Sequence, residues 1–139
     1  MSNLKIKTYT GGQYGAHVFF ILNRGNNSGK PLNEPCPNCF ICICSSAEEK
    51  EKAYWLFYAL WQGKQCEELL VGSVIPFIRK NDLIGLLNRF WNSIANLDET
   101  RKMVKQLNTV QEQEENFHKM LKLSSQLKMV ISHKMLQLN

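Results

Sequence analysis

The sequence lacks any segment that is long and apolar enough to cross a membrane. Its longest apolar run, Ala16 to Leu22, is interrupted by His17 and is far too short to span a bilayer. The opening residues, MSNLKIKTYT, also lack the apolar core that a signal peptide needs. We therefore expect a cytoplasmic protein that makes no contact with a membrane.

The signatures of common enzyme classes are missing as well. No GxSxG or HExxH segment occurs. The segment from Gly25 to Lys30 superficially resembles a phosphate-binding loop, but only three residues separate Gly25 from Gly29, where that loop has four. Pro31 also stands where the magnesium-binding Ser or Thr is required. We expect no enzymatic activity and no cofactor, with a catalytic site assembled from distant residues as the alternative.

The five cysteines are an odd number, and without an export signal they are expected to be reduced thiols. Cys36 and Cys39 have the CxxC spacing of a zinc knuckle. Cys42 and Cys44 continue the same segment as a strand, a geometry that makes four shared ligands awkward. The preferred interpretation is that the thiols are buried as small apolar groups and bind no metal. A small zinc-binding protein using Cys36 and Cys39 is the weaker alternative.

What is present indicates one compact α+β domain over residues 1–96. The apolar fraction of 44% and the charged fraction of 21% are those of a globular protein. Strands are predicted at residues 4–9, 17–22 and 40–44, and residues 69–78 are predicted to form a strand that is bent or broken around Gly72 and Pro76. One helix should begin at Ser45 or Ser46 and end near Gly63, and a second should begin at Asn81 or Asp82 and run through Ile94. We expect a small mixed sheet with these two helices packed on it.

Residues 97–139 are predicted to form a long amphipathic, coiled-coil-like helix. No proline or glycine occurs after Asp98, and eight of the twelve positions at alternating three- and four-residue spacing are apolar. The four exceptions are Thr100, Glu114, Ser124 and Lys128. The candidate interface residues are Met103, Leu107, Val110, Phe117, Leu121, Ile131 and Met135.

Such a helix would extend about 60 Å, which is more than the diameter of the domain beside it. Part of its apolar stripe therefore needs another surface. Self-association, giving a homo-oligomer, is the preferred interpretation. The alternatives are a partner helix from another protein and a helix hairpin broken near Ser124 and Ser125.

The formal net charge of +5 is concentrated toward the two ends of the chain. Such patches attract phosphates, although a solvated surface that keeps the protein in solution is the simpler explanation. Cations on strands and loops suit DNA phosphates, and amides suit base edges. The candidate DNA contacts are Lys5, Lys7, Arg24, Asn26, Asn27, Lys30, Arg79 and Lys80.

Two resemblances rest on longer segments. NSGKPLNEPCPNCF (27–40) and LVGSVIPFIRK (70–80), followed by the polar helix, resemble a family of small uncharacterised proteins from gut Bacteroidota, which implies a bacterial protein but no mechanism. The order of Gly72-Ser73, a short helix and a long helix is similar to the DNA-recognition half of type I restriction specificity subunits. That resemblance implies DNA binding beside a coiled coil.

These observations rank three hypotheses. The first is a non-enzymatic binding or assembly module that dimerises through the C-terminal helix and binds DNA through its basic residues. The second is an adaptor whose helix docks on a helix of another protein. The third is an enzyme or a zinc protein.

Overall fold

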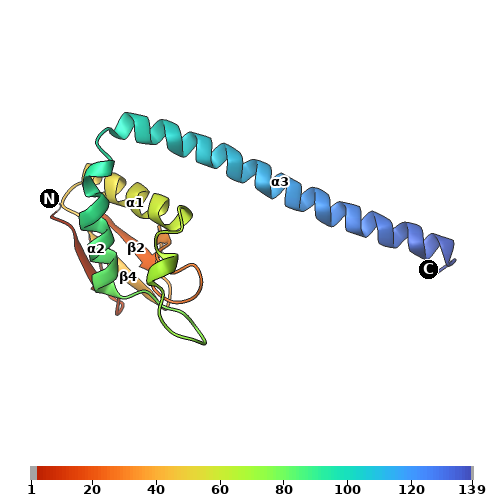
Figure 1. Ribbon diagram of the computed structural model, residues 1–139, viewed down its shortest axis with the longest axis horizontal. Coiled ribbons are helices and arrows are strands. Elements are labelled where there is room, and N and C mark those ends of the chain that lie inside the picture. The colour runs from red at the N-terminus through yellow and green to blue at the C-terminus, as the bar shows by residue number, and fades with distance from the viewer. Residues whose placement is uncertain (1–2, 139) are drawn as a thin grey trace. The chain divides into compact units, whose positions relative to one another are not determined.

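The computed structural model describes residues 3–138 and confirms the α+β class (Figure 1). In chain order the elements are β1 (Lys5–Thr8), β2 (Val18–Leu22), β3 (Pro31–Leu32), β4 (Cys39–Ile43), α1 (Ala47–Gln62), the 3-10 turn η1 (Glu67–Leu69), α2 (Lys80–Phe90), the 3-10 turn η2 (Trp91–Ser93) and α3 (Leu97–Met135). The chain divides into two compact units, Met1–Leu97 and Asp98–Asn139.

The four strands form one sheet in the order β1-β4-β2-β3, and every pairing is antiparallel. The expectation of a mixed sheet was therefore wrong. A parallel pair needs a crossover of about a dozen residues or more. Only β2 and β3 are sheet neighbours joined by a single loop, and residues 23–30 are too few for a crossover, so this pair is antiparallel. β4 lies between β1 and β2 and runs opposite to both.

The two faces of the sheet are divided as the alternation in β4 predicts. Phe40, Cys42 and Cys44 belong to the main core, where α1 and α2 cover the sheet. Cys39 and Ile41 belong to a smaller apolar cluster on the opposite face. In Figure 1 both helices lie on one side of the strands, so the other face is left to the loops.

The ends of α1 confirm the predicted capping residues. The Glu49 backbone N–H donates to Ser46 Oγ over 3.1 Å, and the Glu49 carboxylate accepts from the Ser45 N–H over 3.0 Å. These two bonds satisfy backbone donors that the first helical turn leaves free. Gly63 ends the helix by donating its N–H to the Ala59 carbonyl over 2.8 Å.

The start of α2 differs from the expectation of a cap at Asn81 or Asp82. The helix begins at Lys80, and Arg79 is its extended N-cap without a side-chain hydrogen bond. The Arg79 carbonyl accepts from the N–H groups of Asp82 and Leu83 over 3.1 and 3.2 Å. Burial explains this earlier start, because the helix must turn the fully buried Leu83 into the core.

The strand expected at 69–78 is also not formed. The segment starts with η1 and then doubles back, so that Val71 and Phe77 exchange two hydrogen bonds of 2.9 Å. Gly72 has φ +99°, a left-handed conformation that reverses the chain and that glycine adopts without strain. The tight turn pairs the segment with itself, and Phe77 also forms an antiparallel β-bridge with Arg24 in the loop after β2.

The second unit is the single helix α3, which runs without interruption through Ser124 and Ser125. Serine costs a helix only a few tenths of a kcal/mol relative to alanine, which is too little to break it here. The hairpin alternative was therefore wrong. No helix among residues 3–138 is long and apolar enough to cross a membrane.

Candidate functional site

The eight candidate DNA-binding residues do not form one surface. The fold distributes them over three places. Arg24, Arg79 and Lys80 share one pocket, Asn26 and Asn27 line a second, and Lys7 lines a third.

We call the first place the basic pocket; it has a volume of about 400 Å³. Its lining comes from the loop after β2, the loop before β4, β4 itself and the start of α2, and consists of Asn23, Arg24, Asn38, Phe40, Phe77, Ile78, Arg79 and Lys80. Arg24 and Lys80 are far apart in sequence, and the fold brings them to the same cavity. Three cations and two amides around one cavity suit a phosphate group.

Backbone hydrogen bonds hold the basic pocket together. The Ile78 N–H donates to the Asn23 carbonyl over 3.1 Å, and the Asn23 N–H donates to the Asn38 carbonyl over 3.0 Å. The Gly25 N–H donates to the Pro76 carbonyl over 2.7 Å. Because three separate segments are tied through main-chain groups, the pocket is positioned by the fold and does not depend on the mobility of a single loop.

A turn with an exposed apolar tip lies next to the basic pocket. It comprises residues 72–77, and Val74 is 90% exposed, Ile75 55% and Phe77 39%. Phe77 also lines the basic pocket. Exposed aliphatic side chains beside cations are found in proteins that insert a wedge between DNA bases as well as in proteins that touch anionic membranes.

Lys30, Asn26 and Asn27 belong to a different surface. The Lys30 ammonium lies over the Trp61 ring, 5.0 Å from its centre, a cation–π contact that fixes this side chain against α1. Asn26 and Asn27 line a polar cavity of about 440 Å³ together with Trp61 and other residues of the α1–η1 region. These three candidates therefore do not extend the basic pocket.

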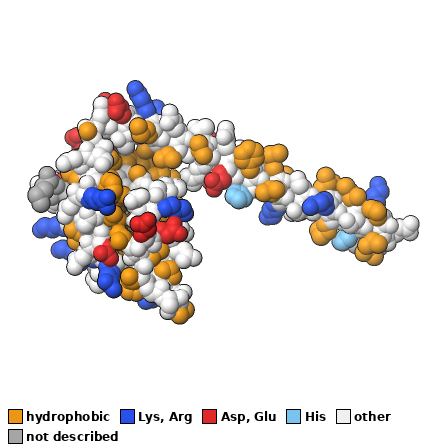
Figure 2. Space-filling view, in the orientation of Figure 1, with side chains coloured by type: hydrophobic (Ala, Val, Ile, Leu, Met, Phe, Trp, Pro, Cys, Tyr) orange, Lys and Arg blue, Asp and Glu red, His pale blue; other side chains and the backbone are white. Residues whose placement is uncertain are grey.

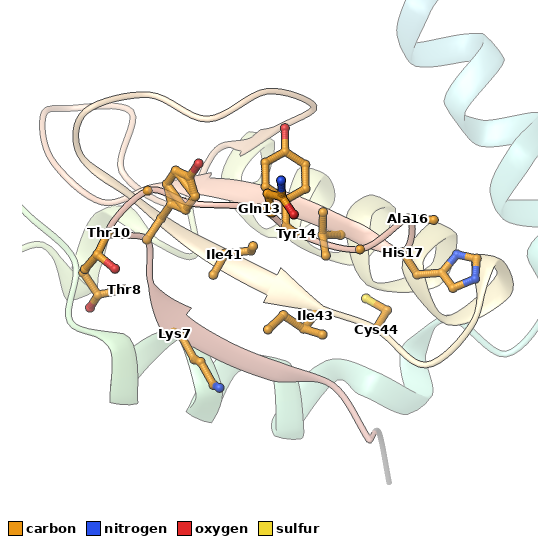
Figure 3. A pocket seen from close by; sticks show the side chains of 14 residues that line it. Lys7, Thr8, Thr10, Gln13, Tyr14, Ala16, His17, Ile41, Ile43 and Cys44 are labelled. Carbon is orange, nitrogen blue, oxygen red and sulfur yellow. The ribbon is translucent and has the colours of Figure 1, made fainter.

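Lys5 and Lys7 project from β1, while Ile6 between them is buried in the main core. Lys7 lines a cavity of about 510 Å³ beneath the loop 9–17. Figure 3 shows Tyr14 and Gln13 of this loop above the strands, Ile41 and Ile43 on β4, and His17 at one end. Sequence reasoning missed this cavity, because the loop's glycines indicate only a turn.

The rings that close this cavity form a small aromatic cluster. The centres of Tyr9 and Tyr14 are each 5.2 Å from that of Phe20, in edge-to-face arrangements. Such pairs contribute about 0.5–1.5 kcal/mol beyond the area they bury. The loop 9–17 thereby covers the apolar cluster of Val18, Phe20 and Ile41 that the helices leave open. Its first role is thus structural.

Cys36 and Cys39 are joined by hydrogen bonds between the Cys39 thiol and the Cys36 backbone, and only Cys39 is buried. Cys39 Sγ donates to the Cys36 carbonyl over 3.1 Å and accepts from the Cys36 N–H over 3.5 Å. Burial raises the pKa of Cys39, and it also raises the pKa of Cys44 to about 12 and that of Cys66 to about 11. Zinc binds thiolates. Among residues 3–138 no three His, Cys, Asp or Glu side chains are grouped so as to hold a metal ion.

The seven candidate interface residues of α3 lie on one stripe, which we call the α3 seam. Their side chains are 38–80% exposed, and no residue of α3 is buried. Figure 2 shows apolar side chains along the length of this helix. The members of the seam are Met103, Leu107, Val110, Phe117, Leu121, Ile131 and Met135.

A family model described as a family of unknown function (DUF6943) matches residues 6–134. The chain belongs to this family. The DUF6943 match begins in β1 and ends within the last turn of α3, so it spans both the sheet domain and the long helix. No curated protein and no solved structure matches the chain. The comparisons thus support an uncharacterised family whose matched region includes the α3 seam from Met103 to Ile131.

Proposed function

We propose that this DUF6943 protein is a non-enzymatic assembly module that self-associates through the α3 seam. The observation that carries the proposal is a helix of 39 residues with no buried residue and a line of exposed apolar side chains at heptad spacing. Burying one such side chain gains about 1.5–3 kcal/mol. Several such side chains on one stripe supply enough free energy to hold two chains together.

The sheet domain has no need of α3 for its own core. Its buried residues run from Ile6 to Leu87, and the partly buried side chains that pack on them end at Ile94. Helices without tertiary packing are marginally stable in water. A second helix on the seam would supply the packing that α3 requires.

Light scattering after size exclusion, on the full chain and on a chain that ends at Asn96, tests the proposal. We expect a dimer for the full chain and a monomer for the shortened one, because removing α3 removes the seam while leaving the main core complete. Circular dichroism of the shortened chain controls for its folding. A full chain that is monomeric at every concentration would assign the seam to a helix of another protein, which is the adaptor hypothesis.

A second proposed activity is binding of DNA phosphates by the basic pocket. Arg24, Arg79 and Lys80 around one cavity support it, together with the two pocket amides. A dimer would carry two such pockets, an arrangement found in proteins that bind two half-sites on DNA. The free cysteines, four of them buried, suit the reducing cytoplasm in which such a protein would act.

The DNA proposal predicts strong salt dependence. Three phosphate contacts per chain should weaken binding about 40-fold between 50 and 200 mM salt. In Arg79→Gln/Lys80→Gln the logarithmic salt slope should become shallower by about 2, measured by fluorescence anisotropy on duplex DNA.

The matched control for this measurement is Lys5→Gln/Lys7→Gln, which removes the same charge from β1. An equal loss in the control would place the contacts outside the basic pocket. Binding to vesicles of anionic lipid but not to DNA would show that the apolar turn 72–77 and its cations serve a membrane surface instead.

A further inference from the structure

Two charged residues at the same heptad positions as the α3 seam restrict how two copies can pair. Glu114 and Lys128 occupy heptad positions equivalent to those of the apolar seam residues. In a parallel, in-register pair each inward residue faces itself. Glu114 would then lie against Glu114, and Lys128 against Lys128. Two layers of like charge would be destabilising along the same interface.

An antiparallel pair removes both conflicts. With a two-fold axis at Lys119, residues equally far before and after that position face each other. Three kinds of layer then join apolar residues to each other, while Lys128 meets Val110 and Glu114 meets Ser124. The facing layers are Phe117 with Leu121, Leu107 with Ile131, Met103 with Met135, Val110 with Lys128, and Glu114 with Ser124.

Neighbouring antiparallel registers are worse. Shifting the pairing by one heptad in one direction places Phe117 against Glu114. The opposite shift places Phe117 against Lys128. Either shift buries a charge against the largest apolar side chain of the seam, which costs several kcal/mol when the charge has no partner. The register centred on Lys119 places neither charge against Phe117, and sets Glu114 against Ser124 and Lys128 against the smaller Val110.

The distribution of charge along α3 favours the same register. The middle of the helix is acidic, with Glu112, Glu114 and Glu115, and no acidic residue follows in the C-terminal half. That half carries only cations, Lys119, Lys122, Lys128 and Lys134. In the register centred on Lys119 the acidic segment lies beside residues 123–126 of the second copy, between its Lys122 and Lys128.

More distant antiparallel registers are unfavourable because of either their charges or their apolar contacts. An axis at Gln126 would lay the four-lysine half of α3 against itself. An axis at Glu112 would leave Ile131 and Met135 without partners, although they are 50% and 80% exposed. Both alternatives shorten the overlap as well as losing either charge complementarity or apolar contact.

We propose that α3 pairs with α3 of a second copy in an antiparallel coiled coil whose two-fold axis crosses the helices at Lys119. This inference rests on the proposed self-association and adds its direction and register. It also gives the assembly a consequence, since antiparallel helices place the two sheet domains at opposite ends of the pair.

Cysteine cross-linking of the full chain tests the register. Cys36 is the half-exposed native thiol and is replaced by serine, while the four buried thiols, with pKa values raised by burial, react slowly. In this background the variants Leu107→Cys and Ile131→Cys are oxidised in a glutathione buffer, first each variant separately and then as a mixture of the two. We expect disulfide-linked dimers in the mixture and fewer than about one-tenth as many in either variant alone. In the proposed register two Leu107 positions are about 36 Å apart.

The outcomes separate the register from the self-association itself. Efficient cross-linking of Leu107→Cys alone, in a protein that is dimeric by light scattering, would overturn the antiparallel register and leave self-association standing. A dimer that forms no disulfide either in the single variants or in their mixture would also overturn the register. A monomeric Cys36→Ser parent would overturn both proposals together.

Discussion

Replacing Phe117 and Leu121 by glutamine in the full chain is expected to weaken dimerisation at least about 1,000-fold. In the proposed register these residues face each other across the axis, so the double substitution removes four apolar side chains from two adjacent central layers. Each contributes about 1.5–3 kcal/mol when buried, and about 4 kcal/mol is already a 1,000-fold change in Kd. Sedimentation equilibrium over a range of concentrations measures the change.

The control for this substitution is Met129→Gln/Leu136→Gln. These residues are 54% and 68% exposed and lie outside the α3 seam, so their replacement removes as many apolar side chains while leaving the facing layers intact. We expect less than about a threefold change in Kd. An equal effect of the two double substitutions would contradict the seam as the interface. Tryptophan fluorescence then confirms that the sheet domain is folded in both proteins.

Gly29→Ala is expected to lower the free energy of unfolding by about 3 kcal/mol. Gly29 has φ +100°, and a Cβ at this position would lie 2.5 Å from Cys66 Sγ and 2.9 Å from Cys66 Cβ. The substitution therefore adds backbone strain to a steric overlap with a fully buried side chain. Because the Gly29 N–H donates to the Leu22 carbonyl over 2.7 Å, the loop cannot move without losing that bond. Urea denaturation measures the loss.

Substitution of a second glycine separates the backbone strain from the steric overlap with Cys66. Gly25 has φ +97°, and a Cβ at this position would meet no neighbouring atom within 4 Å, so Gly25→Ala should show the strain alone, about 1 kcal/mol. Cys66→Ala removes the Sγ atom that Gly29→Ala would strike, and combining the two changes should recover part of the loss. If Gly25→Ala and Gly29→Ala destabilise equally, contact with Cys66 has no part in the effect.

The regular elements were predictable where local signals agreed with each other. In β4 the alternation assigned each side chain to the correct face. Ser46 caps the start of α1 and Gly63 caps its end, as predicted, because caps depend on a few neighbouring backbone groups. α3 was predictable for the same reason, since helix-forming residues without glycine or proline leave the chain no local alternative.

Segments whose conformation depends on distant partners were not predictable. The apolar run after η1 suits a strand, but its conformation is decided by Gly72 and by the hydrogen bonds that Asn23 and Gly25 form with Ile78 and Pro76. The start of α2 depends on the burial of Leu83. In both cases contacts across the domain outweighed local preference.

The sequence by itself determined the α+β class, the capped helix α1 and the exposed seam of α3, because each depends on spacing along one segment. Only the tertiary structure decided which cationic side chains line the same pocket. Arg24 lines the same pocket as Arg79 and Lys80 because main-chain hydrogen bonds join loops that are distant in sequence, whereas Lys30 is held on Trp61. Charge is a property of single residues, but a binding site requires several charges at one place, and only long-range packing fixes that arrangement.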